Sequence, residues 1–384
     1  MVTAVGREWP GAVELEVTQT GGEPCRALAY PALTGRPEPG DRVLLNTTAL
    51  AQGLGTGGYA FVVAVPGRLP PDPPQAAGRE AGHMVKARYT PLQATVPGVD
   101  EQGSPHHGTL RDADDLGGMP VVVADLHSAL PAVLAAARGP VPGAPADVPQ
   151  AAGPQAAGPP GFPAARPSPV RSPPRAVYVM LDGGALPLWF SRACAGLREA
   201  GWLAGTVTTG QAFGGDLEAV TLHTGLLAAR HVLGADLAVV TQGPGNLGTG
   251  TRWGFSGVAC GEAVNAAAVL NGRPVAALRV SEADPRERHH GVSHHSLTAY
   301  GRVALAPADV VVPVLPGGFG ALVNEQAAPL GRRHRLVRVR TEGLDEALRG
   351  CPVPLSSMGR GLAEDPAYFL AAAAAGRHAV SLLG

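Results

Sequence analysis

Residues 119–138 read MPVVVADLHSALPAVLAAAR. The first seven residues form a short apolar run that favours a buried β-strand, and residues 127–138 have the spacing of an amphipathic helix. A strand that is apolar on both faces and leads directly into a helix is typical of the parallel sheets of α/β proteins. This stretch therefore predicts an α/β fold with a parallel sheet.

The same alternation of strand, loop and helix continues towards the C-terminus. Further strands are expected at residues 176–182, 204–210, 235–242, 273–281, 309–317 and 335–341, and helices at residues 186–201, 217–234 and 261–272. Short apolar strands separated by amphipathic helices indicate a mostly parallel sheet with helices on both faces. We expect a three-layer α/β domain over residues 83–384.

The sequence before this domain has a different pattern. Residues 1–66 contain several short alternating strands separated by Pro/Gly turns, which predicts a small β-barrel of the SH3 or OB type. Residues 67–82 are Pro-rich and are expected to be a linker. Residues 139–174 are rich in Pro, Ala and Gly, and we expect a disordered insertion within the α/β domain.

Composition excludes several classes of protein. The formal net charge is -1 and no basic stripe is present, which argues against a nucleic-acid partner. No window has the ~18 apolar residues that span a bilayer, and the N-terminus does not resemble a secretory signal. The four cysteines form no C-x-x-C pair. We expect a cytoplasmic protein with a small-molecule ligand; the choice between a monomer and a homo-oligomer stays open.

Ligands of open parallel sheets bind beyond the carboxyl ends of the strands, so the residues after each strand are the candidate site. Asp125 and His127 follow the strand at 119–125, and Asp182 ends the next one. Each of these residues also has an ordinary structural interpretation. Asp125, for example, fits a helix N-cap, as does Asp216 after the strand at 204–210. The candidate site rests on polar residues at five successive strand ends.

A glycine-rich loop, QGPGNLGTGT, follows the strand at 235–242. Its G-P-G-N-L-G resembles a dinucleotide fingerprint, but no acid closes the following strand at the expected distance. Glycines with nearby hydroxyls and an arginine can bind an anion through backbone N–H groups. The predicted anion-binding residues of the loop are Gly243, Gly245, Asn246, Gly248, Thr249, Gly250, Thr251 and Arg252.

The stretch from Ser281 to Tyr300, SEADPRERHHGVSHHSLTAY, holds four of the chain's twelve histidines in the pattern HH-x3-HH. Imidazoles are common ligands of Zn, Fe, Ni and Mn and also serve as general acids and bases. A divalent metal bound by His127, His290, His294 and Asp125 is one hypothesis. The alternative is metal-free acid–base catalysis, with arginines such as Arg279 holding an anionic substrate. The predicted catalytic set is His290, His294, His295, Asp125, Asp182 and Lys86.

Two further residues complete the predicted site. The chain has 29 arginines and one lysine, Lys86. One interpretation is a position where a compact ammonium is required and a planar guanidinium does not fit, and the alternative is that this lysine remains by chance. Arg360, in a Gly-flanked turn of SSMGRGLAEDP, is a candidate for substrate contact. A helix-capping turn is the alternative for that segment.

Six segments together carry a family resemblance: HMVKARYTPLQ, VADLHSALP, GQAFGGDLEAVTLHTGLLAA, QGPGNLGTGTRWGFSG, RHHGVSHHSLTAYGRVAL and SSMGRGLAEDP. They resemble a bacterial family defined as a domain of unknown function, DUF3866. The resemblance extends over nearly the whole chain apart from residues 139–174. It implies no activity, fold or catalytic residue.

The residues therefore lead to three functional hypotheses. The first is a hydrolase or transferase that acts on a small anionic substrate, with a divalent metal or with histidines as acid and base. The second is a dinucleotide-dependent enzyme that uses the G-P-G-N-L-G loop. The third is a sensor that binds a metabolite in the same crevice without catalysis.

Overall fold

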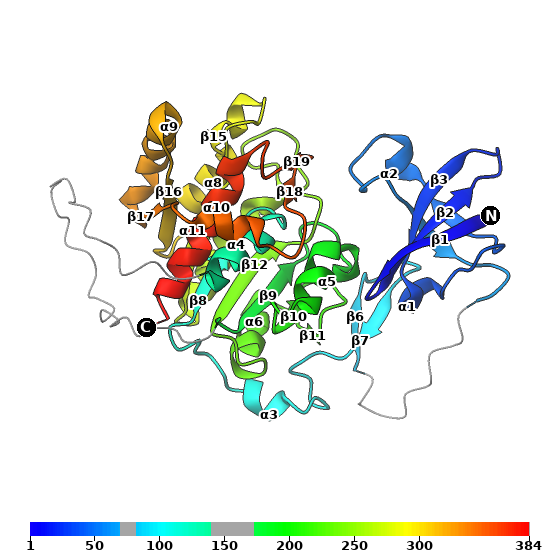
Figure 1. Ribbon diagram of the computed structural model, residues 1–384. Helices are drawn as coiled ribbons and strands as arrows, with labels where there is room; N and C mark the ends of the chain where they lie inside the picture. The colour runs from blue at the N-terminus through cyan, green and yellow to red at the C-terminus, as the bar shows by residue number, and fades with distance from the viewer. Residues whose placement is uncertain (70–81, 140–172, 384) are drawn as a thin grey trace, which may run out of the picture.

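The computed structural model describes residues 1–69, 82–139 and 173–383. Most of the predicted linker (67–82) and of the predicted insertion (139–174) lies outside these residues. A large sheet with helices on both faces forms one unit, and a smaller N-terminal sheet forms a second unit beside it (Figure 1). The predicted three-layer α/β architecture is confirmed.

The large sheet has eight parallel strands in the order β11-β10-β9-β12-β8-β13-β16-β17. Seven of them match predicted strands: they are β8 (Pro120–Val123), β9 (Ala176–Leu181), β10 (Gly205–Thr208), β12 (Leu237–Gln242), β13 (Arg273–Ala277), β16 (Asp309–Val314) and β17 (Arg335–Arg340). The eighth, β11 (Leu217–Glu218), lies where the sequence predicted the start of a helix.

Both faces of the sheet are buried because successive strand residues point to opposite faces and each face meets its own helices. Val121 and Val123 pack into the core that holds α6 (Leu222–His231), α7 (Ala259–Val269) and α9 (Gly317–Ala327). Val122 packs on the other side, into the core that holds α4 (Ala129–Arg138), α5 (Arg192–Glu199), α10 (Leu344–Arg349) and α11 (Pro366–Ser381).

The strand order reverses at the centre of the sheet. From β8 the chain crosses to β9 and moves outward to β10 and β11; it then returns to β12, between β9 and β8, and proceeds to β13, β16 and β17. The loops that leave the carboxyl ends of β8, β12 and β13 therefore meet at one place. This is the topological switch point at which open α/β sheets bind ligands.

The N-terminal unit is a five-stranded sheet in the order β1-β2-β3-β5-β4. Its strands are β1 (Val2–Trp9), β2 (Ala12–Thr18), β3 (Pro24–Ala29), β4 (Leu44–Asn46) and β5 (Ala60–Ala64), and its short helices are α1 (Pro31–Thr34) and α2 (Thr48–Ala51). Small strands were predicted here, but the pairings found do not join β1 to β4, so closure into a barrel is not shown.

Short strands and helices outside the two main sheets complete the structure. Three two-stranded sheets pair β6 (Met84–Lys86) with β7 (Ala94–Val96), β14 (Val280–Ser281) with β15 (Gly291–Val292), and β18 (Ser356–Ser357) with β19 (Arg360–Gly361). The remaining helical segments are α3 (His107–Leu110), α8 (His294–Thr298), η2 (Leu188–Phe190), η3 (Ser256–Val258), η4 (Glu287–His289), η5 (Ala299–Val303) and η6 (Ala328–Arg332).

Two helix predictions were wrong at their N-terminal ends. The predicted helix 217–234 begins only at Leu222, because Leu217–Glu218 pairs with β10 and the Thr221 side chain caps the helix by accepting from the Thr224 amide. The predicted helix 186–201 is divided into η2 and α5 at Ser191, whose hydroxyl accepts from the Cys194 amide.

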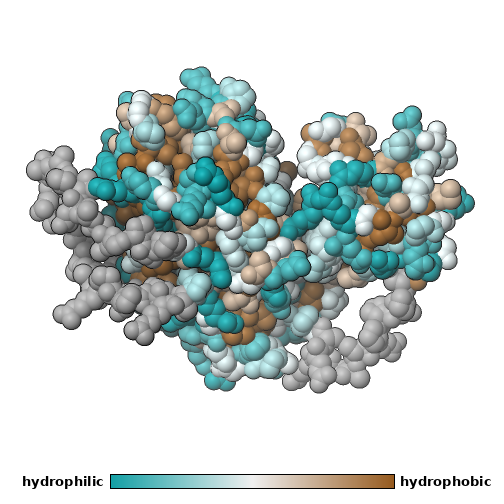
Figure 2. Space-filling model, in the orientation of Figure 1, coloured by the Kyte–Doolittle hydropathy of each residue, from teal (hydrophilic) through white to brown (hydrophobic). Residues whose placement is uncertain are grey.

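The two units contact each other through aromatic side chains. The Trp9 indole donates to the Trp189 carbonyl at 2.6 Å, and Tyr30 packs on the Trp189 ring. Helix α2 of the N-terminal unit is on the side that faces β18 and β19 (Figure 1), and the surface is indented between the upper parts of the units (Figure 2). Residues of α2 and of β18 line the same pocket, which is described next.

Candidate functional site

A pocket of about 820 Å³ lies at the switch point, and we name it the strand-end pocket. The loops after β8, β12 and β13 line it, as do the β14–β15 connection and the segment around β18. Residues Ala49 and Leu54–Thr56 of the N-terminal unit complete its wall. No Asp or Glu is among the described residues that line it, whereas Arg279, Arg286 and Arg288 are, so its wall favours an anionic ligand.

Asp125 is the buried carboxylate behind this pocket. It accepts from Arg279 at 3.2 Å, from the Asn246 amide at 3.0 Å and from the His295 ring at 2.9 Å. Gly257 permits this packing, since a Cβ at that position would lie 1.8 Å from the Asp125 Oδ1. Burial raises the pKa of Asp125, but the hydrogen bond from His295 and the charge of Arg279 outweigh it and the net pKa is lowered. Asp125 is therefore held as an anion, and it is not a helix cap.

The Asp125 carboxylate fixes the tautomer of His295. A carboxylate only accepts, so an imidazole bonded to the Asp125 Oδ2 carries its proton on Nδ1 and its lone pair on Nε2. The Arg279 Nη1, which only donates, lies farther from the same Nδ1, at 3.2 Å against 2.9 Å for the carboxylate. The ring is also held by stacking on Phe255, with the ring centroids 3.8 Å apart and the planes at 6°. A histidine oriented by a buried carboxylate in this way is suited to bind a metal or to accept a proton through Nε2.

Two more histidines meet His295, and we name His289, His294 and His295 the histidine cluster. Their ligand nitrogens lie within 4.8 Å of one another. The His289 Nδ1 is 2.7 Å from the Ser293 hydroxyl, and the His294 Nε2 is a buried nitrogen without a hydrogen-bond partner. Burial lowers the pKa of His289 to about 3 and that of His294 to about 4, so both rings are neutral near pH 7, as metal ligands must be.

The histidine cluster fits a divalent metal. A tetrahedral site with metal–nitrogen bonds of ~2.0–2.1 Å places its nitrogens roughly 3.4 Å apart, which small rotations of these imidazoles can reach from 4.8 Å. Three protein ligands leave a position for water or substrate, and Asp125 supplies the outer carboxylate that commonly orients a metal-bound histidine. Two of the three ligands, His289 and His295, line the strand-end pocket.

The cluster shares only His294 with the predicted ligand set of His127, His290, His294 and Asp125. The His290 ring packs on Phe319 of α9, with the centroids 5.7 Å apart, and His289 takes the place in the cluster that was predicted for His290. Residues 289 and 290 are adjacent, so their side chains point in different directions. The sequence contains no feature that selects between them, because the selection depends on the β14–β15 pairing around them.

His127 lines the strand-end pocket, but the structure does not bring it into the histidine cluster. Both of its ring nitrogens already have partners: Nδ1 is 2.8 Å from the Tyr178 hydroxyl and Nε2 is 2.6 Å from the Ser191 hydroxyl. Burial lowers the pKa of His127 to about 4. A neutral, fully bonded imidazole is thereby held under α4 and α5, away from the cluster.

His127 is expected to make the protein sensitive to acid. The unfolded chain takes up a proton at this residue near pH 6.5 but the folded chain only near pH 4, so stability is present above pH 6.5 and is lost as the pH falls through 4. The loss is on the order of 3 kcal/mol. Urea unfolding at several pH values should show a shallower decline in His127→Gln than in the wild type. Parallel pH curves would contradict this assignment.

The glycine loop follows β12 as predicted and lies in the wall of the pocket. Gly243, Gly245, Asn246, Gly248 and Gly250 line the pocket, and the amides of the last three glycines donate no hydrogen bond within the described residues. Thr249, Thr251 and Arg252 do not line it. The two threonine hydroxyls are 3.2 Å apart, and the Thr251 hydroxyl also accepts from Gly254. The next helical residues begin only at Ser256, whereas a dinucleotide fingerprint leads straight into a helix.

The other predicted residues are divided between the pocket and its surroundings. Arg279 lines the pocket and pairs with Asp125. Arg360 does not line the pocket and instead pairs with Asp284 and Asp365. Asp182 is exposed, and its carboxylate accepts from the backbone amide of Gln211 at 2.8 Å. The structure thus brings Asp125, Arg279, His294 and His295 together and leaves Arg360 and Asp182 outside the cluster.

Lys86 is at the other end of the sheet. Its buried ammonium donates to the carbonyls of Ala212 and Ala219 at 2.8 and 3.1 Å and lies 3.4 Å from the Glu218 carboxylate. These three acceptors match the three N–H bonds of an ammonium, which a planar guanidinium would not. Four strands separate β11 at this edge from β13, which leads to the histidines, so Lys86 does not join the cluster.

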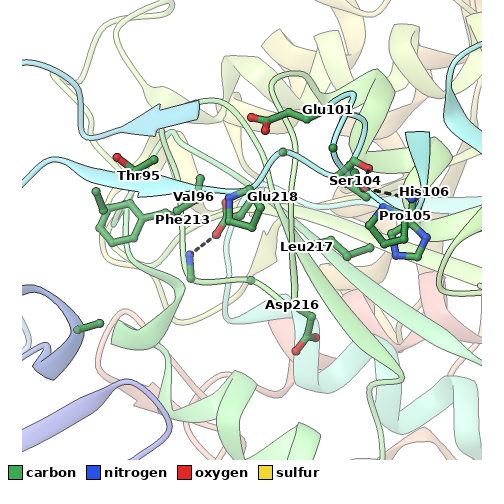
Figure 3. Close-up of a pocket in the computed structure, with 18 of the residues that line it drawn as sticks. Thr95, Val96, Glu101, Ser104, Pro105, His106, Phe213, Asp216, Leu217 and Glu218 are labelled. Atoms are coloured by element: carbon green, nitrogen blue, oxygen red, sulfur yellow. Dashed lines mark hydrogen bonds between the residues drawn. The ribbon is translucent and has the colours of Figure 1, made fainter. Parts of the chain in front are cut away.

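A second pocket, of about 510 Å³, lies beside Glu218 and is lined by β7, the loop after it and residues 213–218 (Figure 3). Glu101, Asp216 and Glu218 give its wall an acidic character. Two of these charges are matched, since Asp216 pairs with Arg198 and Glu218 with Lys86, and Glu101 accepts from the His83 backbone amide. The strand-end pocket is therefore the better candidate for the functional site.

Comparison with known proteins identifies the family to which the chain belongs. Within the described residues, no helix has the length and apolar character needed to cross a membrane. Neither the curated proteins nor the solved structures contain a match to the chain. One family model, described as protein of unknown function (DUF3866), matches residues 26–148 and 164–376, with a break inside the predicted insertion. The chain therefore belongs to the DUF3866 family, as its motifs predicted.

Proposed function

We propose that the protein is a metal-dependent enzyme, a hydrolase or a transferase, that acts on a small anionic substrate in the strand-end pocket. The observation that carries the proposal is the histidine cluster, in which the His294 Nε2 is buried without a partner. A buried nitrogen of this kind costs free energy unless a ligand binds it. A divalent metal is the ligand that would bind all three rings at once.

Each residue of the site has a role in this proposal. His289, His294 and His295 would hold the metal, and Asp125 would keep His295 in the correct tautomer. A bound divalent metal would supply a Lewis acid and a water that ionises near neutral pH. Arg288, which forms no ion pair within the described residues, would hold the anionic group together with the free amides of the glycine loop.

The Asp125–His295 pair also supports a second candidate, which needs no metal. A histidine oriented by a buried carboxylate is a general base when its Nε2 faces a substrate, and His295 lines the pocket. Arg279 and Arg288 would then hold the anionic substrate. A cytoplasmic location is part of both proposals and is supported by four cysteines that are free thiols.

The metal content of the wild-type protein tests the choice between these candidates. Protein purified without chelators should contain about one divalent metal ion per chain, as expected for a three-histidine site. Dialysis against a chelator should remove the ion, and Zn²⁺ or Co²⁺ should restore it. If elemental analysis finds no stoichiometric metal and the protein takes up none, the metal-dependent proposal is wrong and the acid–base candidate stands alone.

A further inference from the structure

Three buried side-chain atoms in the described part of the chain lack a hydrogen-bond partner, and all three are at the proposed site. They are the Thr56 Oγ1, the Gln242 Oε1 and the His294 Nε2. Thr56 and Gln242 line the strand-end pocket, and His294 belongs to the histidine cluster beside it. Folded proteins rarely leave such atoms unpaired. A metal would satisfy His294, but Thr56 and Gln242 require something else.

Gln242 defines what that partner must be. Its amide nitrogen is 2.8 Å from the Asp125 carbonyl and 3.4 Å from the Asp125 Oδ1. Both of these atoms only accept, so the –NH₂ group must face them and the side-chain oxygen must point the other way. That oxygen is directed to Gly183, where a Cβ would lie 2.6 Å from it. Gln242 therefore presents a buried acceptor without a donor among the described residues, and a hydroxyl or an N–H of a ligand would supply one.

Thr56 places the same ligand between the two units. It belongs to the segment after α2, which with Ala49, Leu54 and Gly55 forms the part of the pocket wall contributed by the N-terminal unit. A threonine hydroxyl both donates and accepts, so it suits a hydroxylated partner. The ligand would thus contact the N-terminal unit as well as the sheet.

The rest of the wall is suited to an anion. Arg279 and Arg286 are paired with Asp125 and Asp284, whereas Arg288 forms no ion pair within the described residues and its guanidinium lies next to Gly250. The unbonded amides of the glycine loop line the same pocket. A volume of about 820 Å³ is within the range of small-molecule sites.

From these contacts we infer that the strand-end pocket binds a polyhydroxylated anion, such as a sugar phosphate or a sugar acid. The anionic group would lie at Arg288 and the glycine loop, and hydroxyl groups would donate to the Gln242 Oε1 and contact Thr56. The inference deepens the proposed function and rests on its anion site, but it does not require the metal.

Matched probes test the inference. Isothermal titration calorimetry of the full chain, freed of metal by a chelator, would compare D-ribose 5-phosphate with pentyl phosphate, and D-gluconate with hexanoate. Within each pair the carbon number and the charged group are the same. The alkyl probe lacks the oxygen substituents and, in the first pair, the furanose ring. The hydroxylated probe of at least one pair should bind about tenfold more tightly, since it pairs a buried acceptor that the alkyl probe leaves unpaired. The pair that binds distinguishes phosphate from carboxylate.

Two variants assign the preference to residues. Gln242→Met removes the acceptor and should reduce the preference to about twofold or less. Thr56→Val keeps the shape of the side chain, lies in the other unit and should weaken binding of the hydroxylated probe by about threefold to tenfold, which keeps the test valid if Gln242→Met does not fold. Gln19→Met, on the exposed β2–β3 turn, is the control and should change neither value.

The outcomes separate this inference from the metal centre. Equal affinities within both pairs, no binding of any probe at millimolar concentration, or a preference that both variants leave intact would overturn the polyhydroxylated ligand. Metal content measured on the same samples reports the proposed function by itself. A preference for hydroxylated probes in a protein that takes up no metal would support the ligand class and remove the metal.

Discussion

Replacement of His294 by alanine is expected to lower the affinity of the protein for Zn²⁺ or Co²⁺ by about 10³-fold, which is ~4 kcal/mol. Loss of an outer partner of a ligand already costs 10–100-fold at many sites, so the loss of one of three ligands should cost more. A competition titration against a chromophoric chelator would give both dissociation constants. Co²⁺ would in addition show a change in its absorption bands when a histidine ligand is lost.

His290→Ala is the matched control for this prediction. It removes a neighbouring imidazole from the same segment, but that ring packs on Phe319 outside the cluster. The metal affinity of His290→Ala should equal that of the wild type. Equal losses in both variants, or none in either, would mean that the histidine cluster is not a metal site.

The stability of the metal-free His294→Ala protein separates a ligand from a structural residue. The His294 Nε2 has no hydrogen-bond partner, so its removal should change the free energy of unfolding by only about 1 kcal/mol or less. A side chain whose removal strongly weakens metal binding but changes the stability of the fold little is one retained for function. Large destabilisation without metal would contradict this interpretation of the cluster.

The sheet could be predicted from the sequence because its strands are apolar on both faces. Val121, Val122 and Val123 are all fully buried, so a continuous apolar run marks the strand whichever face each residue takes. The two-residue strand β11 could not be predicted in the same way. Leu217 and Glu218 continue without a break into an amphipathic pattern, and only the pairing with β10 makes them a strand.

The site could be predicted only in part, and the reason differs between residues. The rule for strand ends brought Asp125 and the histidine segment together, because it depends on topology and the topology follows from the order of strands and helices. The roles of individual side chains depend on partners that are distant in sequence. His127 is bonded by Tyr178 and Ser191, and Lys86 by the loops near Ala212 and Ala219, and no local pattern reveals such partners.

Gln242, which the sequence prediction missed, illustrates the remaining difficulty. It is the last residue of a predicted strand, so its position at the carboxyl edge was available from the sequence. An amide at a strand end is chemically unremarkable until its nitrogen is known to be occupied by Asp125. Inspection of every polar residue at the strand ends, and not only of the charged ones and the glycines, could have identified it as a candidate.

Lys86→Met is expected to destabilise the protein by about 3–5 kcal/mol, because it leaves the buried Glu218 carboxylate without its cation. Burial lowers the pKa of Lys86 and raises that of Glu218, and the charge of each residue opposes the shift of the other. The pair ties the β6–β7 hairpin to the loops after β10 and at β11. Urea unfolding followed by circular dichroism would measure the loss.

The double variant Lys86→Met/Glu218→Gln distinguishes the charge from the packing. A neutral glutamine can still accept from the Gly214 amide and contact the Thr208 hydroxyl, as Glu218 does now. Removal of both charges should therefore recover most of the stability that Lys86→Met loses, to within about 1–2 kcal/mol of the wild type. Arg349→Met, which breaks the exposed pair with Asp345 in α10, is the control and should cost about 0.5 kcal/mol or less.

The same Lys86 variants test whether Lys86 has a catalytic role. The loss of a structural ammonium affects binding only through stability, whereas the loss of a catalytic ammonium affects binding or turnover directly. If Lys86 acts only through Glu218, the double variant should regain the ligand affinity of the strand-end pocket together with its stability, since Lys86 does not line the pocket and four strands separate β11 from β13, which leads to the histidines. A double variant that is as stable as expected but has lost binding or turnover would show that the ammonium acts on the site. In that case Lys86 would belong to the catalytic set that the sequence predicted.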